Sequence, residues 1–537
     1  MPASTKSHLS RLRQWSVGWK RARLPEISSR DRIRLLLVFQ PGRALRILLH
    51  ALMVLLALAP SLTGYSIYLT DIPNAVARIT INLRLIADPS SSGFYAFKPV
   101  LIPNMALDAW GLLLGRWIGA ENAVLIFIML VIVSLYAVTQ LLHHLIVGRT
   151  SLVVGALSLA LIDSGPFRLG LLNYELGTAI MLATIALTEY QVARPSGVTA
   201  PGSIAARSAL CLLSVMCSVF PTALYGCYVA GRLRSVLQRQ DRNESAKRIL
   251  ALGLPFLPVV AFLAVAQDLP PGASYATHWT LYGKMSGIVT LLYVRGLGME
   301  RPVAIGFAGA LVLLFAVCRF RIAPSQRLGL VLMAALYLLL PSQLFNVDGI
   351  DYRLAQPIAL LLIASTELSP RDGAIWAERA RLVGASLVLL ALVRPLASIA
   401  NLQPVEQLRL SMSRLFLAIP PGSRVLVVTD LPEFRYFGQR IWHLPLLSAT
   451  EHRSDIITGA VFTNFFTRRK QAPDKSVPNA VWLGVDALPD LCRWTHVLLI
   501  GQPSSLTSPL LQAGERTDGA ATMLDIDRTS CATPSNQ

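Results

Sequence analysis

Long apolar blocks alternate with short polar or basic segments along most of this chain. The blocks include residues 123–142, 249–266, 303–317, 328–340 and 382–393. A helix of about 18 to 20 apolar residues spans the hydrocarbon core of a bilayer. The shorter blocks need their less apolar flanks to do so. Counting all such blocks between residues 44 and 401 predicts an α-helical polytopic protein with roughly ten to twelve membrane segments.

The composition supports a membrane protein. Of the 537 residues, 53% are hydrophobic and only 15% are charged, and the mean hydropathy is +0.53. A soluble domain carries nearer a quarter charged residues, so this chain could not cover a water-facing surface.

The net charge of +19 is concentrated where it bears on membrane orientation. Residues 1–43 hold a cluster of arginines and lysines opposed only by Glu26 and Asp31. The positive-inside rule makes this basic tail cytoplasmic, so the first helix, 44–62, leads outward as an uncleaved anchor. Contact with anionic lipid explains the charge better than nucleic acid, which we exclude as a partner.

Basic residues flank the apolar stretch 209–230 on both sides, which a single crossing cannot explain. We therefore predict two half-helices that enter the membrane and return, with a break near Pro221, because proline removes a backbone hydrogen bond. The alternation of later blocks then places everything after residue 401 outside.

Two segments on the outer face have a mixed character. The loop 63–119 contains amphipathic stretches at 75–86 and 101–117, which suit the membrane surface. Residues 402–527 predict a small α/β domain, with strand-like runs at 424–429 and 497–501, before a disordered tail at 528–537. Cys492 and Cys531 could pair there if the compartment is oxidising, and the sequence leaves that disulfide open.

Polar groups at the outer ends of apolar helices are the best candidates for chemistry, because they are costly to hold there. Asp71 follows the first predicted helix and could accept a proton from an incoming hydroxyl. Its alternative role is to cap the next helix, which has Pro73 at an early position.

Other polar residues return to the same outer surface. Arg78 can hold a phosphate or the Asp71 carboxylate. Asp351 and Arg353 could instead form a structural ion pair, and Asn173 could simply bond neighbouring helices. The predicted substrate-binding residues are Arg78, Lys98, Asn104, Asp108, Asn173, Asp348, Asp351 and Arg353.

The order of these features resembles the GT-C class of membrane glycosyltransferases, which use polyprenyl-phosphate-linked sugars as donors. Four stretches carry the resemblance and are similar to poorly characterised bacterial multi-spanning proteins: TDIPNAVAR, PNMALD, GLLNYELG and DYRLAQPIALLLIAS. One departure is that many GT-C enzymes have two acidic residues in the first outer loop, whereas Asn74 and Arg78 follow Asp71 here. Metal dependence therefore stays open, with a divalent cation as a candidate cofactor and no metal ligand assigned.

The resemblance implies transfer of a sugar from a polyprenyl-phosphate donor to an unidentified acceptor at a bacterial inner membrane, with membrane lipids as further partners. Asp71 would be the general base, and Arg78, Lys98 or Arg353 would offset charge on the leaving phosphate. Two alternatives remain, a transporter or flippase of lipid-linked glycan and a non-catalytic assembly protein of the same architecture. Nucleotide-binding and serine-hydrolase motifs are absent from the sequence.

Overall fold

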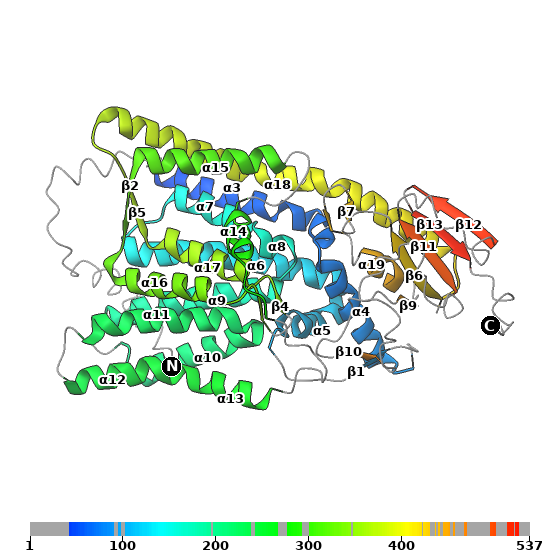
Figure 1. The fold of residues 1–537 in the computed structure, drawn as a ribbon, viewed down its shortest axis with the longest axis horizontal. Helices are drawn as coiled ribbons and strands as arrows, with labels where there is room; N and C mark the ends of the chain where they lie inside the picture. Colours follow the sequence, from blue (N-terminus) through cyan, green and yellow to red (C-terminus); the bar gives the residue numbers. More distant parts are fainter. Residues whose placement is uncertain are drawn as a thin grey trace, which may run out of the picture.

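A computed structural model shows a long helical bundle with a small β-sheet at one end (Figure 1). We call that end the sheet end, and the opposite end, which carries the strand pair β2 (Cys318–Ile322) and β5 (Thr366–Pro370), the hairpin end. The structure describes residues 42–90, 95–97, 103–194, 197–237, 242–266, 277–292, 300–344, 347–421, 423–429, 435–436, 439–440, 444–451, 455–456, 467–469, 495–500, 513–519 and 521–525.

Most helices of the bundle lie along its long axis (Figure 1). Their order in the chain follows the predicted alternation of apolar blocks. In chain order, the described helices of the bundle are α3 (Arg43–Leu62), η2 (Tyr65–Tyr68), α4 (Ile72–Ala87), α5 (Ala106–Ile118), α6 (Ala120–Val147), α7 (Leu152–Ile162), α8 (Gly165–Arg168), α9 (Leu172–Val192), α10 (Pro201–Cys217), α11 (Val219–Leu237), α12 (Arg242–Gly253), η3 (Leu254–Phe256), α13 (Leu257–Val265), α14 (Leu281–Val289), α15 (Glu300–Val317), α16 (Pro324–Leu339), α17 (Ile350–Ala364) and α18 (Ala374–Leu417).

Five helical stretches in the described part of the chain are long and apolar enough to cross a membrane: 44–62, 120–147, 243–265, 300–317 and 374–417. Three shorter apolar helices, α7, α10 and α16, lie beside them in the bundle. The basic tail, of which only residues 42 and 43 are described, otherwise lies outside the described residues.

The stretch 209–230 breaks as predicted, but the limbs are not half-helices. The break falls at Ser218, where the backbone is extended (φ −169°, ψ 145°), rather than at Pro221. Helix α10 begins at Pro201, and α11 continues to Leu237 with Arg232 inside it. At 1.5 Å per residue each helix is about 25 Å long. The chain forms a full helical hairpin of α10 and α11. The basic residues on both sides of the stretch 209–230 therefore lie at the same end of the hairpin.

Helix α18 runs past the predicted domain boundary at residue 402. It continues without interruption for 44 residues, through Pro395 and Pro404, and reaches the sheet end (Figure 1). Its last turns carry an apolar stripe that includes the buried Leu408, Met412 and Phe416. The stripe packs against the C-terminal strands, so burial of this face extends the helix beyond the apolar block.

The C-terminal sheet has five strands in the order β12-β13-β11-β6-β9. Both predicted strands are present, as β6 (Arg424–Thr429) and β11 (His496–Ile500), and they pair in parallel. Helix α19 (Leu444–Glu451) links this region to α4 and α18. The remaining strands are β9 (Asp455–Ile456), β12 (Ala513–Asp518) and β13 (Ala521–Asp525), with separate pairs β1 (Tyr95–Phe97)–β10 (Thr467–Arg469), β3 (Gln343–Leu344)–β4 (Val347–Asp348) and β7 (Arg435–Tyr436)–β8 (Gln439–Arg440).

The two amphipathic stretches of the first loop form helices with different surroundings. Helix α5 keeps Leu113 and Trp117 exposed, at 57% and 74%, as a helix at a membrane surface does. Helix α4 instead lies between α5, α6 and α19, and most of its residues are buried. Helix α4 is therefore packed inside the bundle instead of along its surface, and a position of α5 at the membrane surface stays a prediction.

Candidate active site at the sheet end of the bundle

Asp71 stands immediately before α4, at the capping position of that helix. Its side chain makes no capping hydrogen bond to the first turn of α4, although Pro73 is at the expected early position. The side chain is half-buried. Asn74, one turn further on the same face, buries an Oδ1 that has no hydrogen-bond partner within the described residues. Asp71 thus occupies the N-capping position of α4, but its side chain does not make the capping hydrogen bond.

The turn between α8 and α9 fixes the backbone on which Asp71 sits. The amide of Thr70 donates to the carbonyl of Arg168 at 3.3 Å, and the amide of Asp71 donates to that of Leu169 at 3.1 Å. Gly170 has φ +79°, and a Cβ there would lie 3.2 Å from the Asp71 Cβ. Glycine is therefore required both by the turn conformation and by the close approach of the two segments.

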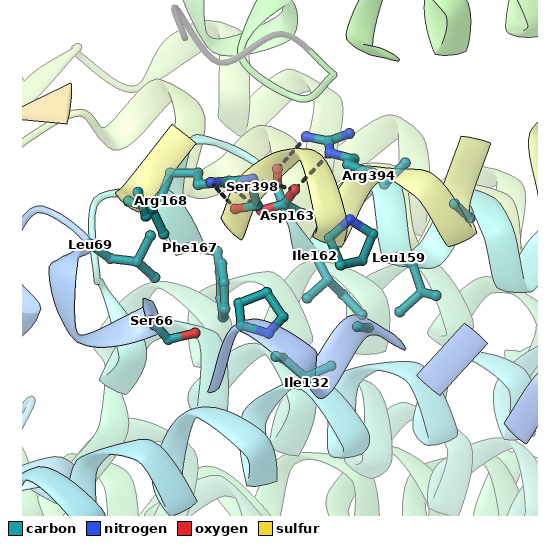
Figure 2. A pocket seen from close by; sticks show the side chains of 16 residues that line it. Ser66, Leu69, Ile132, Leu159, Ile162, Asp163, Phe167, Arg168, Arg394 and Ser398 are labelled. Atoms are coloured by element: carbon teal, nitrogen blue, oxygen red, sulfur yellow. Dashed lines mark hydrogen bonds and ion pairs between the residues drawn. The ribbon is translucent and has the colours of Figure 1, made fainter. Parts of the chain in front are cut away.

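Arg168 turns its side chain the other way, into a buried ionic network with Asp163 (Figure 2). Its Nε lies 2.5 Å from Asp163 Oδ1, and its Nη1 lies 2.8 Å from Glu300 Oε1 and 2.6 Å from Ser398 Oγ. From α18, Arg394 Nε donates to Asp163 Oδ2 at 2.7 Å. Burial alone would raise the pKa of Asp163, but the two guanidinium groups outweigh it and lower that pKa.

This network forms the polar wall of a cavity with about 570 Å³ of empty space between α3, α7 and α18 (Figure 2). Leu69, two residues before Asp71, lines it, so the cavity adjoins the Asp71 loop. Arg394 Nη1 is buried and has no hydrogen-bond partner among the described residues. The other walls are mainly apolar, from Ala57, Pro60, Ile132, Leu159, Ala160, Ile162, Phe167, Ala391, Pro395 and Leu402, with the hydroxyl of Ser66.

None of the motifs considered in the sequence indicated this network, because Asp163, Arg168 and Glu300 belong to none of them. Arg394 was the available signal. It directly follows the apolar block 382–393 and is itself followed by apolar residues, and a charge within such a segment is costly.

Arg78 and Asp108 do not reach the surface expected of substrate-binding residues. They form a buried two-pronged ion pair, with Arg78 Nε 2.5 Å from Asp108 Oδ1 and Nη2 2.9 Å from Oδ2. Each carboxylate oxygen already accepts from the guanidinium fork. The predicted phosphate contact of Arg78 is thus replaced by a link between α4 and α5.

Asn173 contacts Asn104, but through a hydrogen bond to its backbone that joins two segments of the fold. Asn173 Nδ2 donates to the carbonyl of Asn104 at 2.8 Å, and Asn173 Oδ1 accepts from the amide of Leu107 at 2.6 Å. Asn104 has φ +72°, a conformation that asparagine tolerates better than most residues. The interhelical hydrogen bond considered from the sequence is therefore present, and it holds the start of α5 against α9.

Asp351 pairs with Lys284 of α14 instead of Arg353. Both side chains of this pair are buried, and Lys284 Nζ also donates to the carbonyl of Leu340. Arg353 lies half-buried on α17 and interacts electrostatically with Tyr174, in the first turn of α9. Asp348 contributes its backbone to β4. Lys98, Cys492 and Cys531 lie outside the described residues.

A divalent cation has no evident protein site in the described ranges. Three or more His, Cys, Asp or Glu side chains are nowhere grouped there as a metal ion would require. We therefore derive no catalytic step through a cation.

The fold matches that of a solved membrane protein. The crystal structure of ArnT from Cupriavidus metallidurans in the apo state aligns with a TM-score of 0.52 and 11% identity, over 90% of this chain and 99% of ArnT. ArnT bound to undecaprenyl phosphate aligns with a TM-score of 0.51 and 12% identity, over 88% and 97%. No family model and no curated protein matches the sequence. The expected fold, a polytopic helical bundle with a small C-terminal sheet, is confirmed.

Proposed function

We propose that this protein is a membrane glycosyltransferase that moves a sugar from a polyprenyl-phosphate donor to an acceptor on the extracytoplasmic side. One observation carries the proposal. Asp71 occupies the first loop after the first membrane helix, in a fold shared with ArnT, for which a structure bound to undecaprenyl phosphate exists.

The reaction needs a base, a cationic group and an acceptor. An acceptor hydroxyl or amide attacks the anomeric carbon of the sugar, and the bond from that carbon to the phosphate oxygen breaks. The lipid phosphate leaves with the electron pair of this bond, while Asp71 takes the acceptor's proton. Arg353 and Lys98 are the cationic candidates, because Arg78 is already paired with Asp108.

The orientation follows from the basic tail. By the positive-inside rule the hairpin end faces the cytoplasm, which puts Asp71 and the C-terminal sheet on the extracytoplasmic side. A bacterial inner membrane fits this arrangement. The buried network of Asp163, Arg168 and Arg394 then supports the Asp71 loop from within, since the Arg168 backbone accepts the Thr70 amide.

Replacing Asp71 by asparagine tests the proposal. Asp71→Asn keeps the shape of the side chain but cannot accept a proton, and loss of a general base lowers rates by about 10²- to 10⁴-fold. We expect a loss of that size in transfer of labelled sugar from polyprenyl phosphate in membranes, with unchanged protein level and thermal stability. Asp88→Asn, at the exposed opposite end of α4, is the matched control and should retain activity.

Three outcomes would count against the proposal. Full transfer by the Asp71→Asn protein would remove Asp71 from the chemistry. Loss of the folded protein itself would favour a structural role, as in a non-catalytic assembly protein. Unchanged glycans in cells lacking the gene, together with loss of lipid-linked sugar export, would favour a flippase.

A further inference from the structure

A second cavity lies at the hairpin end, far along the bundle from Asp71. It has about 770 Å³ of empty space, which includes space open to solvent, and is formed by segments that are distant in the sequence. Its walls come from α3, the turn between α6 and α7, and the β2–β5 pair, with contributions from α15 and α18. The lining residues are Arg46, His143, Arg149, Thr150, Ser151, Leu152, Val153, Val154, Leu314, Cys318, Leu368, Pro370 and Ala380.

The charged side chains that line this cavity are positive. Two arginines, Arg46 and Arg149, line it, and neither aspartate nor glutamate does. Arg371 adds a third positive charge close to Cys318. Among the described residues neither lining arginine forms an ion pair, whereas Arg78, Arg168 and Arg394 are all paired with carboxylates. A cavity with this imbalance favours an anion.

The lining arginines are held in place by the fold. Arg149 Nη2 donates to the carbonyl of Leu368 at 3.1 Å, which ties it to β5. Arg46 lies in the first turns of α3 and is half-buried. His143 is buried, and its ring Nδ1 lies 3.1 Å from the carbonyl of Ala364. The two arginines therefore line the cavity from different elements, α3 and the turn between α6 and α7.

An apolar surface continues from the cavity along α3. Only 11% of the span 44–62 is buried within the protein. Leu45, Leu48 and Leu55 are 49%, 61% and 57% exposed. Leu45 directly precedes Arg46, and the other two follow it along the same helix. An anion bound at Arg46 would therefore have hydrocarbon-facing surface directly beside it, which a free phosphate does not need and an acyl chain does.

We propose that this cavity binds the headgroup phosphate of an anionic phospholipid, with the acyl chains along the exposed face of α3. The site is independent of the proposed sugar transfer. It lies at the end of the bundle where the basic loops gather, which is where anionic headgroups of the cytoplasmic leaflet are found. The lipid bridges α3 to the β2–β5 pair through Arg46 and Arg149.

Lipid retention by the full-length protein tests this proposal. The protein is incubated with vesicles of equimolar phosphatidylglycerol and phosphatidylcholine, extracted, and weighed with its bound lipids by native mass spectrometry. We expect the wild type to retain phosphatidylglycerol about 10-fold over phosphatidylcholine, and Arg46→Gln/Arg149→Gln to lose that preference. Arg46→Lys/Arg149→Lys keeps both charges and should retain most of it. Arg321→Gln/Arg327→Gln removes two exposed charges at the same end and is the matched control.

Three results would overturn the proposal. The first is an unchanged preference in the Arg46→Gln/Arg149→Gln protein. The second is an equal loss in the Arg321→Gln/Arg327→Gln control, which would indicate general surface charge. The third is displacement of the lipid by millimolar inorganic phosphate, which would indicate a site for the free anion. Thermal melting checks that each variant is folded, and Arg149→Gln alone replaces the double variant if that one unfolds.

Discussion

Most buried charged side chains in the described part of the chain lie beside an opposite charge. Glu175, which accepts from Gln356, and Arg207, which donates to backbone carbonyls, differ from this pattern. An isolated ionised side chain in a low-dielectric interior costs several kcal/mol, and a close partner with good geometry offsets much of that cost. Apart from Arg168–Asp163, the pairs join segments that are distant in the sequence, so each also fixes how two elements pack. The pairs inside the bundle are Arg78–Asp108, Arg168–Asp163, Arg394–Asp163, Arg168–Glu300, Arg232–Glu189 and Lys284–Asp351.

Asp163 makes stability depend on acid pH. Its pKa is lowered in the folded protein, because Arg168 and Arg394 overcome the opposing effect of burial. A lowered pKa means that the carboxylate stabilises the fold above its unfolded pKa of about 4, and that this contribution is lost as pH falls toward the folded pKa. We expect the melting temperature to fall between about pH 5 and pH 3.

Asp163→Asn should remove that part of the acid dependence. At pH 7 it leaves Arg168 and Arg394 short of a buried partner, and we expect a loss of about 3 kcal/mol in unfolding free energy. Thermal melting in detergent from pH 7 to pH 3 measures both effects. Asp372→Asn removes an exposed partner of Arg319 and is the control, expected to cost little. Equal melting of Asp163→Asn and wild type at pH 7 would contradict the assignment.

At the scale of elements, small residues set how closely some helices approach. Helices α11 and α16 meet at Gly231 and Gly329, and a Cβ on Gly231 would lie 2.3 Å from the Gly329 amide nitrogen and 2.6 Å from its Cα. Those atoms are backbone and cannot rotate away. Close approach at small residues is a common way for membrane helices to pack.

Gly231→Ala should therefore force α11 and α16 apart. Overpacking of this kind costs about 1 to 3 kcal/mol, and the ion pair of Arg232 with Glu189 one residue away should weaken as well. Thermal unfolding in detergent measures the loss. Gly309→Ala in α15 is the matched control, because no atom lies within 4 Å of the added Cβ. That variant should be neutral or slightly more stable, and a similar loss in both variants would show that the helix contact is not the cause.

At the scale of the whole molecule, the bundle separates two chemically different ends. The hairpin end carries the basic loops and the cavity lined by Arg46 and Arg149. The sheet end carries Asp71, the cavity beside it and the C-terminal sheet, which contacts the bundle through α18 and α19 (Figure 1). Sugar transfer on the extracytoplasmic side requires these ends to lie on opposite sides of the membrane.

Cysteine accessibility tests this orientation. In a chain whose native cysteines are replaced, a cysteine at position 88 lies at the sheet end and one at position 372 at the hairpin end, and both positions are exposed. We expect a membrane-impermeant maleimide to label position 88 in intact cells and position 372 only after permeabilisation. Labelling of position 372 from outside, with position 88 protected, would reverse the orientation and rule out the proposed extracytoplasmic site.

The apolar pattern alone determined the broad architecture, because helix length and hydrophobicity are local properties of the chain. It predicted the strand β6 to the residue, and the apolar blocks 123–142 and 303–317 lie within α6 and α15. It also indicated that the stretch around Pro221 must break. The resemblance of short motifs added an expected helical fold with a small C-terminal sheet, and the fold of ArnT matches that expectation.

Tertiary structure decided which charged residues meet, because ion pairing depends on packing between helices far apart in the chain. Nothing in the spacing of Arg78, Asp351 or Arg394 specified Asp108, Lys284 or Asp163 as partners. Packing also carried α18 beyond its apolar block and buried α4 instead of leaving it on the surface. The sequence determined which segments are apolar enough for the membrane, and the fold determined which polar side chains remain available to a substrate.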